Sequence, residues 1–379
     1  MAQYILVGCD LHDRDMILRV SEDQGPVEKR TLPNTHSGRK AMVAELKRRS
    51  AAAGGAKVIV VYEAGPHGFV LYDAMVKASL ECHVLAPTHL AKSPKAKRTK
   101  SDGRDSRRLL GVLRSWLFAS EELHEVWVPD RELRDERELT RVRGDASRGL
   151  TRSKTRVQML LKRYGLRKPE SVGESWTKRH RAWLQGLTGD GSPLGPGTRT
   201  ALGRLLDEVT WGEGQTKVME ADVVELSRAP RYAEAVAVAT EDPGVGVLTA
   251  MVYLTEMGDL RRFVNRAVVG SFVGLSPSQD QSGEVAGGFG HITHQGPARV
   301  RWVLNQSVWM WIRTDPKARA FVDRMVAEHP KYGKRIAVVA LMRRRAVRLW
   351  HRCREAQIRS GSFGPPGVGD VVPLGTRRP

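Results

Sequence analysis

The chain has 379 residues, enough for two or three domains with separate cores, and 41% of them are hydrophobic, which excludes an intrinsically disordered protein. It carries 62 Lys and Arg against 42 Asp and Glu, a formal net charge of +20, which favours a nucleic acid as the partner. No apolar run approaches the ~20 residues of a membrane-spanning helix, and the three cysteines (Cys9, Cys82 and Cys353) are too far apart for a disulfide framework or a CxxC zinc pattern.

The chain begins with a predicted β-hairpin. Residues 4–10 and 15–20 are strand-like segments joined by a short polar turn, and residues 27–32 are a third candidate strand. Because the N-terminus lacks the basic and apolar regions of a secretory signal, we expect a cytoplasmic protein.

Helices and strands alternate after the hairpin. Apolar residues at helical spacing predict helices over 37–50, 67–78 and 105–118. Strands are predicted over 58–62, whose uninterrupted apolar character indicates burial on both faces, and over 81–85. A hairpin followed by alternating strands and helices is the element order of a ribonuclease-H-like fold, so we predict an α/β domain over residues 1–125.

Four acidic residues of this domain are candidate metal ligands. Asp10 and Glu63 each end an apolar strand, while Asp102 and Asp105 stand three residues apart at the start of a helix. Ligands gather at the carboxyl ends of parallel strands, and converging carboxylates suit Mg²⁺ ions that act on a phosphodiester. Acids at a helix start also cap free N–H groups. On spacing alone that role is the commoner one for Asp102 and Asp105, but an acid after a buried strand has no such local role.

A cluster of cations precedes these two acids, and we predict that it steers a phosphate backbone toward Asp102. Its members are Lys92, Lys95, Lys97, Arg98 and Lys100.

Residues 126–229 are predicted to form a helical linker. A long, highly charged helix over 130–167, with a possible break at Gly144 or Gly149, has too few apolar residues for a globular core. With a return arm over 198–226, it is typical of a projecting helical hairpin or coiled coil. The cations of the first arm indicate a surface that binds nucleic acid, although charge runs are usually solvated faces. The predicted binding residues are Arg148, Arg152, Lys154, Arg156, Lys162 and Arg163.

Residues 230–358 are predicted to form a mostly helical C-terminal domain. Pro243-Gly244-Val245-Gly246 lies between two helical segments and would present backbone N–H groups to a phosphate. A polar loop over 274–284, a Gly-rich segment to Gly296 and helices over 298–313 and 335–354 follow. Residues 359–379, rich in Gly and Pro, are predicted to be disordered.

Three tryptophans of this domain are placed at helical spacing, and we predict that they belong to the core instead of stacking on bases. They are Trp302, Trp309 and Trp311.

The four acids, the Pro243-Gly244-Val245-Gly246 motif and the Gln281-Ser282-Gly283 motif together resemble the DEDD transposases of the Piv/MooV type, insertion-sequence recombinases guided by a bridge RNA. The resemblance covers residues 4 to about 355. It implies a RuvC-like domain whose acids bind Mg²⁺, a coiled-coil linker, and a transposase domain with a helix-hairpin-helix and a nucleophilic serine.

The serine that precedes glycine in this motif is Ser282, with Ser278 as the second candidate. The resemblance further implies that Ser282 of one subunit meets the acids of another and forms a covalent phosphoserine–DNA intermediate. The implied partners are target and donor DNA, a noncoding guide RNA that confers specificity, and further copies of the chain in a dimer or tetramer; no membrane is implied.

The sequence departs from the family pattern at two places. Gly65-Pro66-His67 stands where the family has Thr-Gly and an aromatic residue, and Pro297 replaces an asparagine. The four acids and Ser282 match the pattern. The alternative function is a RuvC-like, Mg²⁺-dependent, structure-specific endonuclease without serine chemistry, and a non-catalytic nucleic-acid-binding protein is a third.

Overall fold

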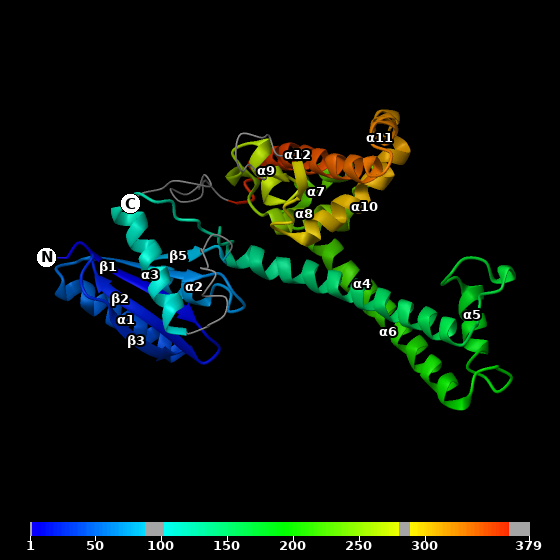
Figure 1. The fold of residues 1–379 in the computed structure, drawn as a ribbon, viewed down its shortest axis with the longest axis horizontal. Coiled ribbons are helices and arrows are strands. Elements are labelled where there is room, and N and C mark those ends of the chain that lie inside the picture. The colour runs from blue at the N-terminus through cyan, green and yellow to red at the C-terminus, as the bar shows by residue number, and fades with distance from the viewer. Residues whose placement is uncertain (1, 88–101, 280–288, 364–379) are drawn as a thin grey trace. The chain divides into compact units, whose positions relative to one another are not determined.

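The structure is a computed structural model that describes residues 2–87, 102–279 and 289–363. The chain divides into two compact units, the first ending at Pro129 and the second beginning at Asp130 (Figure 1).

The first unit is built on a five-stranded mixed sheet with the order β3-β2-β1-β4-β5. Its strands are β1 (Tyr4–Leu11), β2 (Asp15–Glu22), β3 (Glu28–Pro33), β4 (Lys57–Glu63) and β5 (Glu81–Leu85). The first three strands form an antiparallel meander, while β4 runs parallel to both β1 and β5. The predicted hairpin and α/β order are confirmed, and the mixed sheet is consistent with a ribonuclease-H-like DEDD domain.

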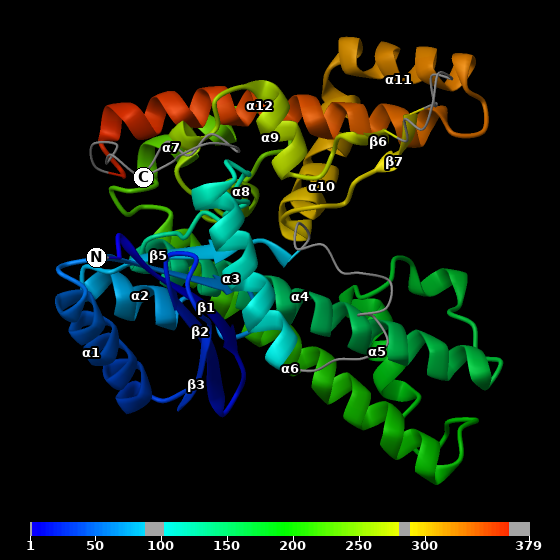
Figure 2. The ribbon, with the colours of Figure 1, turned by 60° about the vertical axis from the view of Figure 1, so that its left-hand side comes forward.

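Helices cover both faces of this sheet (Figure 2). On one face, α1 (His36–Ala52) and α2 (Val70–Lys77) contribute buried residues such as Met42 and Met75. On the other face, α3 (Asp102–Phe118) packs Leu109, Leu110 and Leu113 against Leu6 and Ile59. Val58 to Tyr62 are buried, as expected of a strand covered on both faces.

His83 of β5 connects the sheet to the segment that follows α3. Its ring nitrogens lie 2.9 Å from Glu81 and 2.9 Å from Glu125, and its ring meets Trp116 edge-on at 5.3 Å. Burial disfavours the charged imidazole, but the hydrogen bonds of Glu125 and Glu81 outweigh it and raise the pKa of His83 to about 9. The imidazolium is therefore part of the folded first unit at neutral pH.

The second unit starts with an antiparallel helical hairpin of α4 (Arg131–Arg163) and α6 (Pro196–Leu226). Two ion pairs between the helices show the antiparallel direction, because Arg143 pairs with Glu220 while Arg156, further along α4, pairs with the earlier Glu208 of α6. The predicted break at Gly144 or Gly149 is wrong, because α4 is continuous. A mid-helix glycine costs only about 1 kcal/mol, and packing against α6 offsets that cost.

A short helix that the sequence pattern did not predict, α5 (Lys178–Gly186), packs near the far end of this hairpin. Leu184 of α5 joins the apolar cluster between the two arms, which contains Val157, Leu160 and Leu202. The hairpin therefore has a small core of its own.

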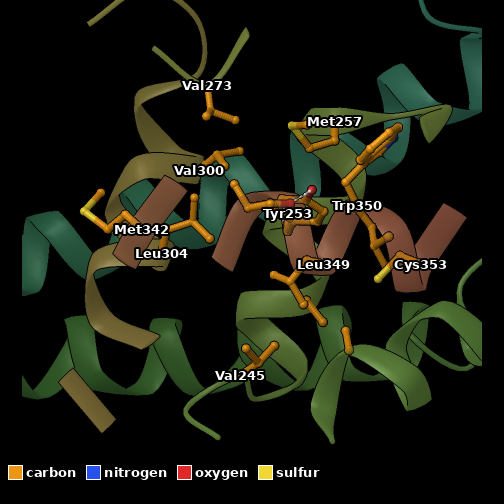
Figure 3. Close-up of a cluster of buried hydrophobic side chains, with 14 of the residues drawn as sticks. Val245, Tyr253, Met257, Val273, Val300, Leu304, Met342, Leu349, Trp350 and Cys353 are labelled. Carbon is orange, nitrogen blue, oxygen red and sulfur yellow. Dashed lines mark hydrogen bonds between the residues drawn. The ribbon is translucent and has the colours of Figure 1, made fainter. Parts of the chain in front are cut away.

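The remaining helices form the largest core around α12 (Gly333–Ser360). They are α7 (Ala233–Thr240), α8 (Val247–Met257), α9 (Arg266–Phe272), α10 (Ala298–Thr314) and α11 (Pro316–Glu328). In Figure 3, Leu349, Trp350 and Cys353 of α12 lie beside Tyr253 and Met257 of α8. The Tyr253 hydroxyl donates to the Ala346 carbonyl at 2.8 Å, and the Trp350 indole donates to the Leu260 carbonyl at 2.9 Å.

Two elements of this region were not predicted, α11 and the small hairpin of β6 (Pro277–Gln279) and β7 (Phe289–Ile292). The last helix extends to Ser360, and residues 364–379 of the predicted tail lie outside the described residues. None of the helices that the structure describes is long and apolar enough to cross a membrane.

The first arm of the hairpin is anchored to the C-terminal helices by polar contacts. Arg141 donates to both carboxylate oxygens of Glu256, at 2.8 and 3.1 Å, and Glu256 is only 6% exposed. One residue earlier in each helix, the hydroxyls of Thr140 and Thr255 are 3.1 Å apart. A bidentate pair at a buried carboxylate holds α4 against α8 more firmly than a surface ion pair would.

Candidate metal site and nucleic-acid-binding surfaces

Asp10 and Glu63 lie at neighbouring strand ends on the same face of the sheet. In the parallel pairing of β1 with β4, Cys9 is opposite Tyr62, so the next residue of each strand is one of the two acids. Side chains alternate between faces along a strand, which places Asp10 on the face of Leu6 and Glu63 on the face of Ile59. That face is the one covered by α3, and the side chain of Asp10 is 18% exposed.

The direction of α3 brings its first turn toward the same edge. The ring of Phe118, at the end of α3, contacts the ring of Tyr4 at the start of β1, with centroids 6.3 Å apart. Further along β1, a Cβ atom at Gly8 would lie 2.5 Å from the backbone oxygen of Ser106, so only glycine permits this approach. The helix therefore runs back along β1, and its first turn points to the strand end that carries Asp10.

Asp105 is half-buried in this first turn, and Asp102 is the first residue of α3, with a side chain outside the described residues. Within the side chains that the structure describes, no three His, Cys, Asp or Glu form a group that could hold a metal ion. The donor types nevertheless fit Mg²⁺, because carboxylate oxygens are the hard ligands that this ion prefers.

His12, which the sequence pattern did not single out, also lies at this edge. Its Nε2 atom lies 3.2 Å from Oδ2 of Asp10. The turn that carries it is fixed, because its backbone N–H donates to the Asp15 carbonyl at 2.8 Å and its carbonyl accepts from the Asn34 side chain at 2.8 Å. The available signal was its position two residues after Asp10, since residues i and i+2 of a strand share a face.

Ser282 lies in residues 280–288, outside the described part of the chain, and the Ser278 side chain is not described either. The flanking segments are closely packed. Gly274 has φ +69°, and a Cβ atom on it would lie 2.0 Å from the Gln295 carbonyl oxygen. Arg301 donates to the carbonyls of Gln295 and Gly296 at 2.9 and 3.2 Å, which holds this crossing in place. Pro297 follows directly as the N-cap residue of α10 and makes no side-chain cap.

The Pro243–Gly246 motif packs against α10. Gly244 has φ +82°, and a Cβ atom on it would lie 2.4 Å from the Ser307 carbonyl oxygen. The preceding Asp242 is 1% exposed and lies 3.4 Å from the equally buried Arg345, with Arg348 at 2.7 Å. Burial lowers the pKa of the Arg345 guanidinium, and Asp242 opposes that shift. This motif therefore has a structural role in joining α7, α8, α10 and α12.

The predicted cations of α4 do not share one face. Arg148, Arg152 and Arg156 follow one another at intervals of one helical turn, and Arg163 lies close to the same line. Lys154 points elsewhere: its Nζ is 2.7 Å from Glu213 and 5.2 Å from the centroid of the Trp176 ring. Lys162 is exposed, and Lys92, Lys95, Lys97, Arg98 and Lys100 all lie outside the described residues.

The sequence matches two profiles of transposase families. A profile of DEDD transposases of the IS110 type, described as transposase, matches residues 7–166. A second profile, described as the transposase IS116/IS110/IS902 family, matches residues 237–323. The two matches cover separate parts of the chain in the order predicted from the motifs.

Three proteins from insertion elements or named as transposases are similar to this chain, two of them over most of its length. A candidate transposase of Sinorhizobium fredii, y4rJ, is 29% identical over 329 residues, which are 83% of this chain and 82% of that protein. The transposase for insertion sequence element IS1533 of Leptospira borgpetersenii is 25% identical over 301 residues, 78% of this chain and 81% of that protein. A 43.6 kDa protein of the insertion element IS110 in Streptomyces coelicolor is 30% identical over 171 residues, 44% of this chain and 40% of that protein.

Proposed function

This chain belongs to the IS110 family of transposases, and from that membership we propose that it cuts and rejoins DNA with a magnesium-dependent site and a serine nucleophile. The acids are Asp10, Glu63, Asp102 and Asp105, and the nucleophile is Ser282. The family membership supports DNA cleavage and rejoining in general terms. The assignment of these residues is our own.

The observation that carries the proposal is the geometry of the sheet edge. The β1–β4 register sets Asp10 beside Glu63 on the face covered by α3, and the Gly8 contact directs the first turn of α3 toward them. This arrangement supports the proposal that acids from three separate elements act together, a role that capping of a single helix would not require of Asp10 and Glu63.

The four carboxylates would hold the ion, which when bound supplies positive charge to the phosphodiester and to the leaving oxygen. Asp10 and Glu63 are fixed by strand pairing, so they bring preorganised negative charge to the edge. His12 lies beside this carboxylate, with its Nε2 atom 3.2 Å from Oδ2 of Asp10. Carboxylates on paired strands favour a site that needs little reorganisation.

In the proposed reaction, the Ser282 hydroxyl oxygen forms a bond to the phosphorus of a DNA phosphodiester, and the bond from phosphorus to one deoxyribose oxygen breaks. The serine proton is lost to water, and the leaving oxygen takes up a proton. Attack of another strand end on the phosphoserine reverses these changes and restores the serine. The alternative, attack by water, would leave free ends and no protein on the DNA.

Specificity is proposed to come from a noncoding bridge RNA that pairs with target and donor DNA, and the active assembly is proposed to be a dimer or tetramer. The net charge of +20 supports binding of nucleic acids by the protein without sequence readout. A serine from one subunit acting with the acids of another would make catalysis depend on assembly.

The test is a cleavage assay with end-labelled donor and target DNA and the RNA that copurifies with the protein. In Mg²⁺, the unaltered chain should form a labelled adduct that survives denaturing electrophoresis. Ser282→Ala should abolish the adduct, Ser278→Ala should retain it, and Asp105→Asn should remove cleavage. An adduct in Ser282→Ala overturns the nucleophile, and cleavage to free ends in that variant supports the nuclease alternative.

A further inference from the structure

A groove runs along α4 within the second unit. Its walls come from α4, α6, α8 and α10, and its volume is about 1480 Å³. Segments separated by more than a hundred residues in the sequence build it. Nothing in the proposed cleavage reaction uses it.

One wall of the groove is a row of arginines. Arg148, Arg152 and Arg156 line it at successive turns of α4, and Arg163 continues the row. Four residues of an α-helix advance about 6 Å, so the guanidinium groups are spaced for successive phosphates of an extended strand. From Arg148 to Arg163 the row covers about 22 Å.

The charge of the groove is not neutralised by the protein. Seven arginines line it, the four of the row together with Arg143, Arg204 and Arg299. Within the part of the chain that the structure describes, these seven have four carboxylate partners, namely Asp145, Asp207, Glu208 and Glu220. Among the described residues, Arg152 and Arg163 form no ion pair, and both are exposed and so accessible to a ligand. A row in which only two of the four arginines have a carboxylate partner within the described ranges attracts a polyanion.

The lining also includes apolar side chains and one exposed aromatic side chain. Leu248 and Val252 of α8 and Val303 of α10 form part of it. Beside them stands Trp302, which is 54% exposed, so its predicted place in the core is wrong. An indole of this area is normally buried or hydrogen-bonded; within the described parts of the chain, Trp302 makes no hydrogen bond.

Trp309, on the same helix, offers an internal comparison. It is 40% exposed, which corrects its predicted place in the core as well, but it lies outside the groove. Its indole donates to Asn305 at 2.8 Å, and Lys334 lies 5.4 Å from its ring centroid. Trp309 therefore has partners within the chain, whereas Trp302 faces the groove.

We propose that this groove binds an unpaired stretch of nucleic acid, with its phosphates on Arg148, Arg152 and Arg156 and a base stacked on Trp302. A cationic track beside an exposed aromatic ring is the combination by which proteins hold single strands. In a duplex the base faces are already stacked on one another, so Trp302 would have no surface to contact. The shared chemistry fits single-stranded RNA and single-stranded DNA, and the experiment separates the two.

Binding should be measured with the full chain, freed of copurified nucleic acid, by fluorescence anisotropy of labelled single-stranded RNA, single-stranded DNA and duplex DNA in EDTA. Trp302→Ala should weaken single-strand binding by about 5- to 100-fold, Trp302→Phe should restore most of it, and Trp309→Ala should not change it. Arg152→Glu should weaken binding and reduce the slope of log affinity against log salt by at least about 0.7. Arg335→Glu, an exposed arginine of α12 outside the groove, is the matched control.

A second measurement does not depend on the stability of a variant. Single strands that contain 5-iodouracil should crosslink to the peptide that carries Trp302, as identified by mass spectrometry. Duplex binding that equals single-strand binding, or crosslinks confined to other peptides, would overturn the proposal. Because the assays contain EDTA and can be repeated with Asp105→Asn, failure here is distinguishable from failure of the proposed cleavage chemistry.

Discussion

Replacing Gly8 with alanine tests whether the contact between β1 and α3 sets the metal site. The new Cβ atom would lie 2.5 Å from the backbone nitrogen of Leu110 and 2.5 Å from the backbone oxygen of Ser106. Non-bonded heavy atoms are at rest near ~3.5 Å. Because both neighbours are backbone atoms, no side chain can rotate away, and α3 must move from the sheet by about 1 Å.

The expected cost follows from that displacement. Overpacking of a core contact costs about 1–3 kcal/mol, which in a unit of this size corresponds to a loss of about 4–12 °C in Tm. Since misplacement of a reacting group by ~1 Å can cost on the order of 100-fold in rate, Mg²⁺-dependent cleavage should fall much further than the folded fraction does.

The matched control is Gly111→Ala on the exposed side of α3, where a Cβ atom meets nothing within 4 Å. That variant should gain about 0.5–1 kcal/mol of stability, because alanine is the better helix former, and should cleave normally. Stability is measured by thermal melting under circular dichroism, and cleavage at a temperature where all variants are folded. If Gly8→Ala melts and cleaves like the unaltered chain, the inferred approach of α3 to β1 is wrong.

Three further predictions concern charge. The pKa of His83 is raised to about 9 in the folded first unit, so its imidazolium contributes roughly 3 kcal/mol to the free energy of unfolding. This contribution is complete below the ordinary histidine pKa of ~6.5 and is lost as pH rises through about 9. Between pH 6 and pH 10, the urea midpoint of the unaltered chain should therefore fall more than that of His83→Ala, and equal falls would contradict this. Asp242→Asn should destabilise the second unit by about 3–5 kcal/mol, because it leaves the buried Arg345 without its carboxylate. Glu328→Gln, which removes one partner of an exposed ion pair, should cost under about 1 kcal/mol. Similar denaturation midpoints for the two variants would refute this difference. Millimolar Mg²⁺ should raise the Tm of the unaltered chain by mass action and raise that of Asp10→Asn less, and an identical rise in both would exclude Asp10 as a ligand.

Local sequence patterns predicted most of the elements in the first unit. The apolar run before Glu63 matches β4, and the helical spacing before Phe118 matches α3, because burial on one or both faces leaves a periodic trace in the sequence. The same rules overestimated the effect of Gly144, since they weigh local propensity without the packing of α6 on α4. They also missed α11, which leaves many of its side chains exposed and so shows a weak pattern.

By itself, the sequence determined the order of strands and helices, the basic excess, and the placement of Asp10 and Glu63 at strand ends, because each follows from neighbouring residues. The tertiary structure alone decided that these acids share a face with the first turn of α3, and that Arg345 is buried while Trp302 is exposed. Periodicity reports how apolar a helix face is, but not which distant segment covers it. The arginine groove exists because α4, α8 and α10 meet, and residues so far apart in the chain leave no local signal of their contact.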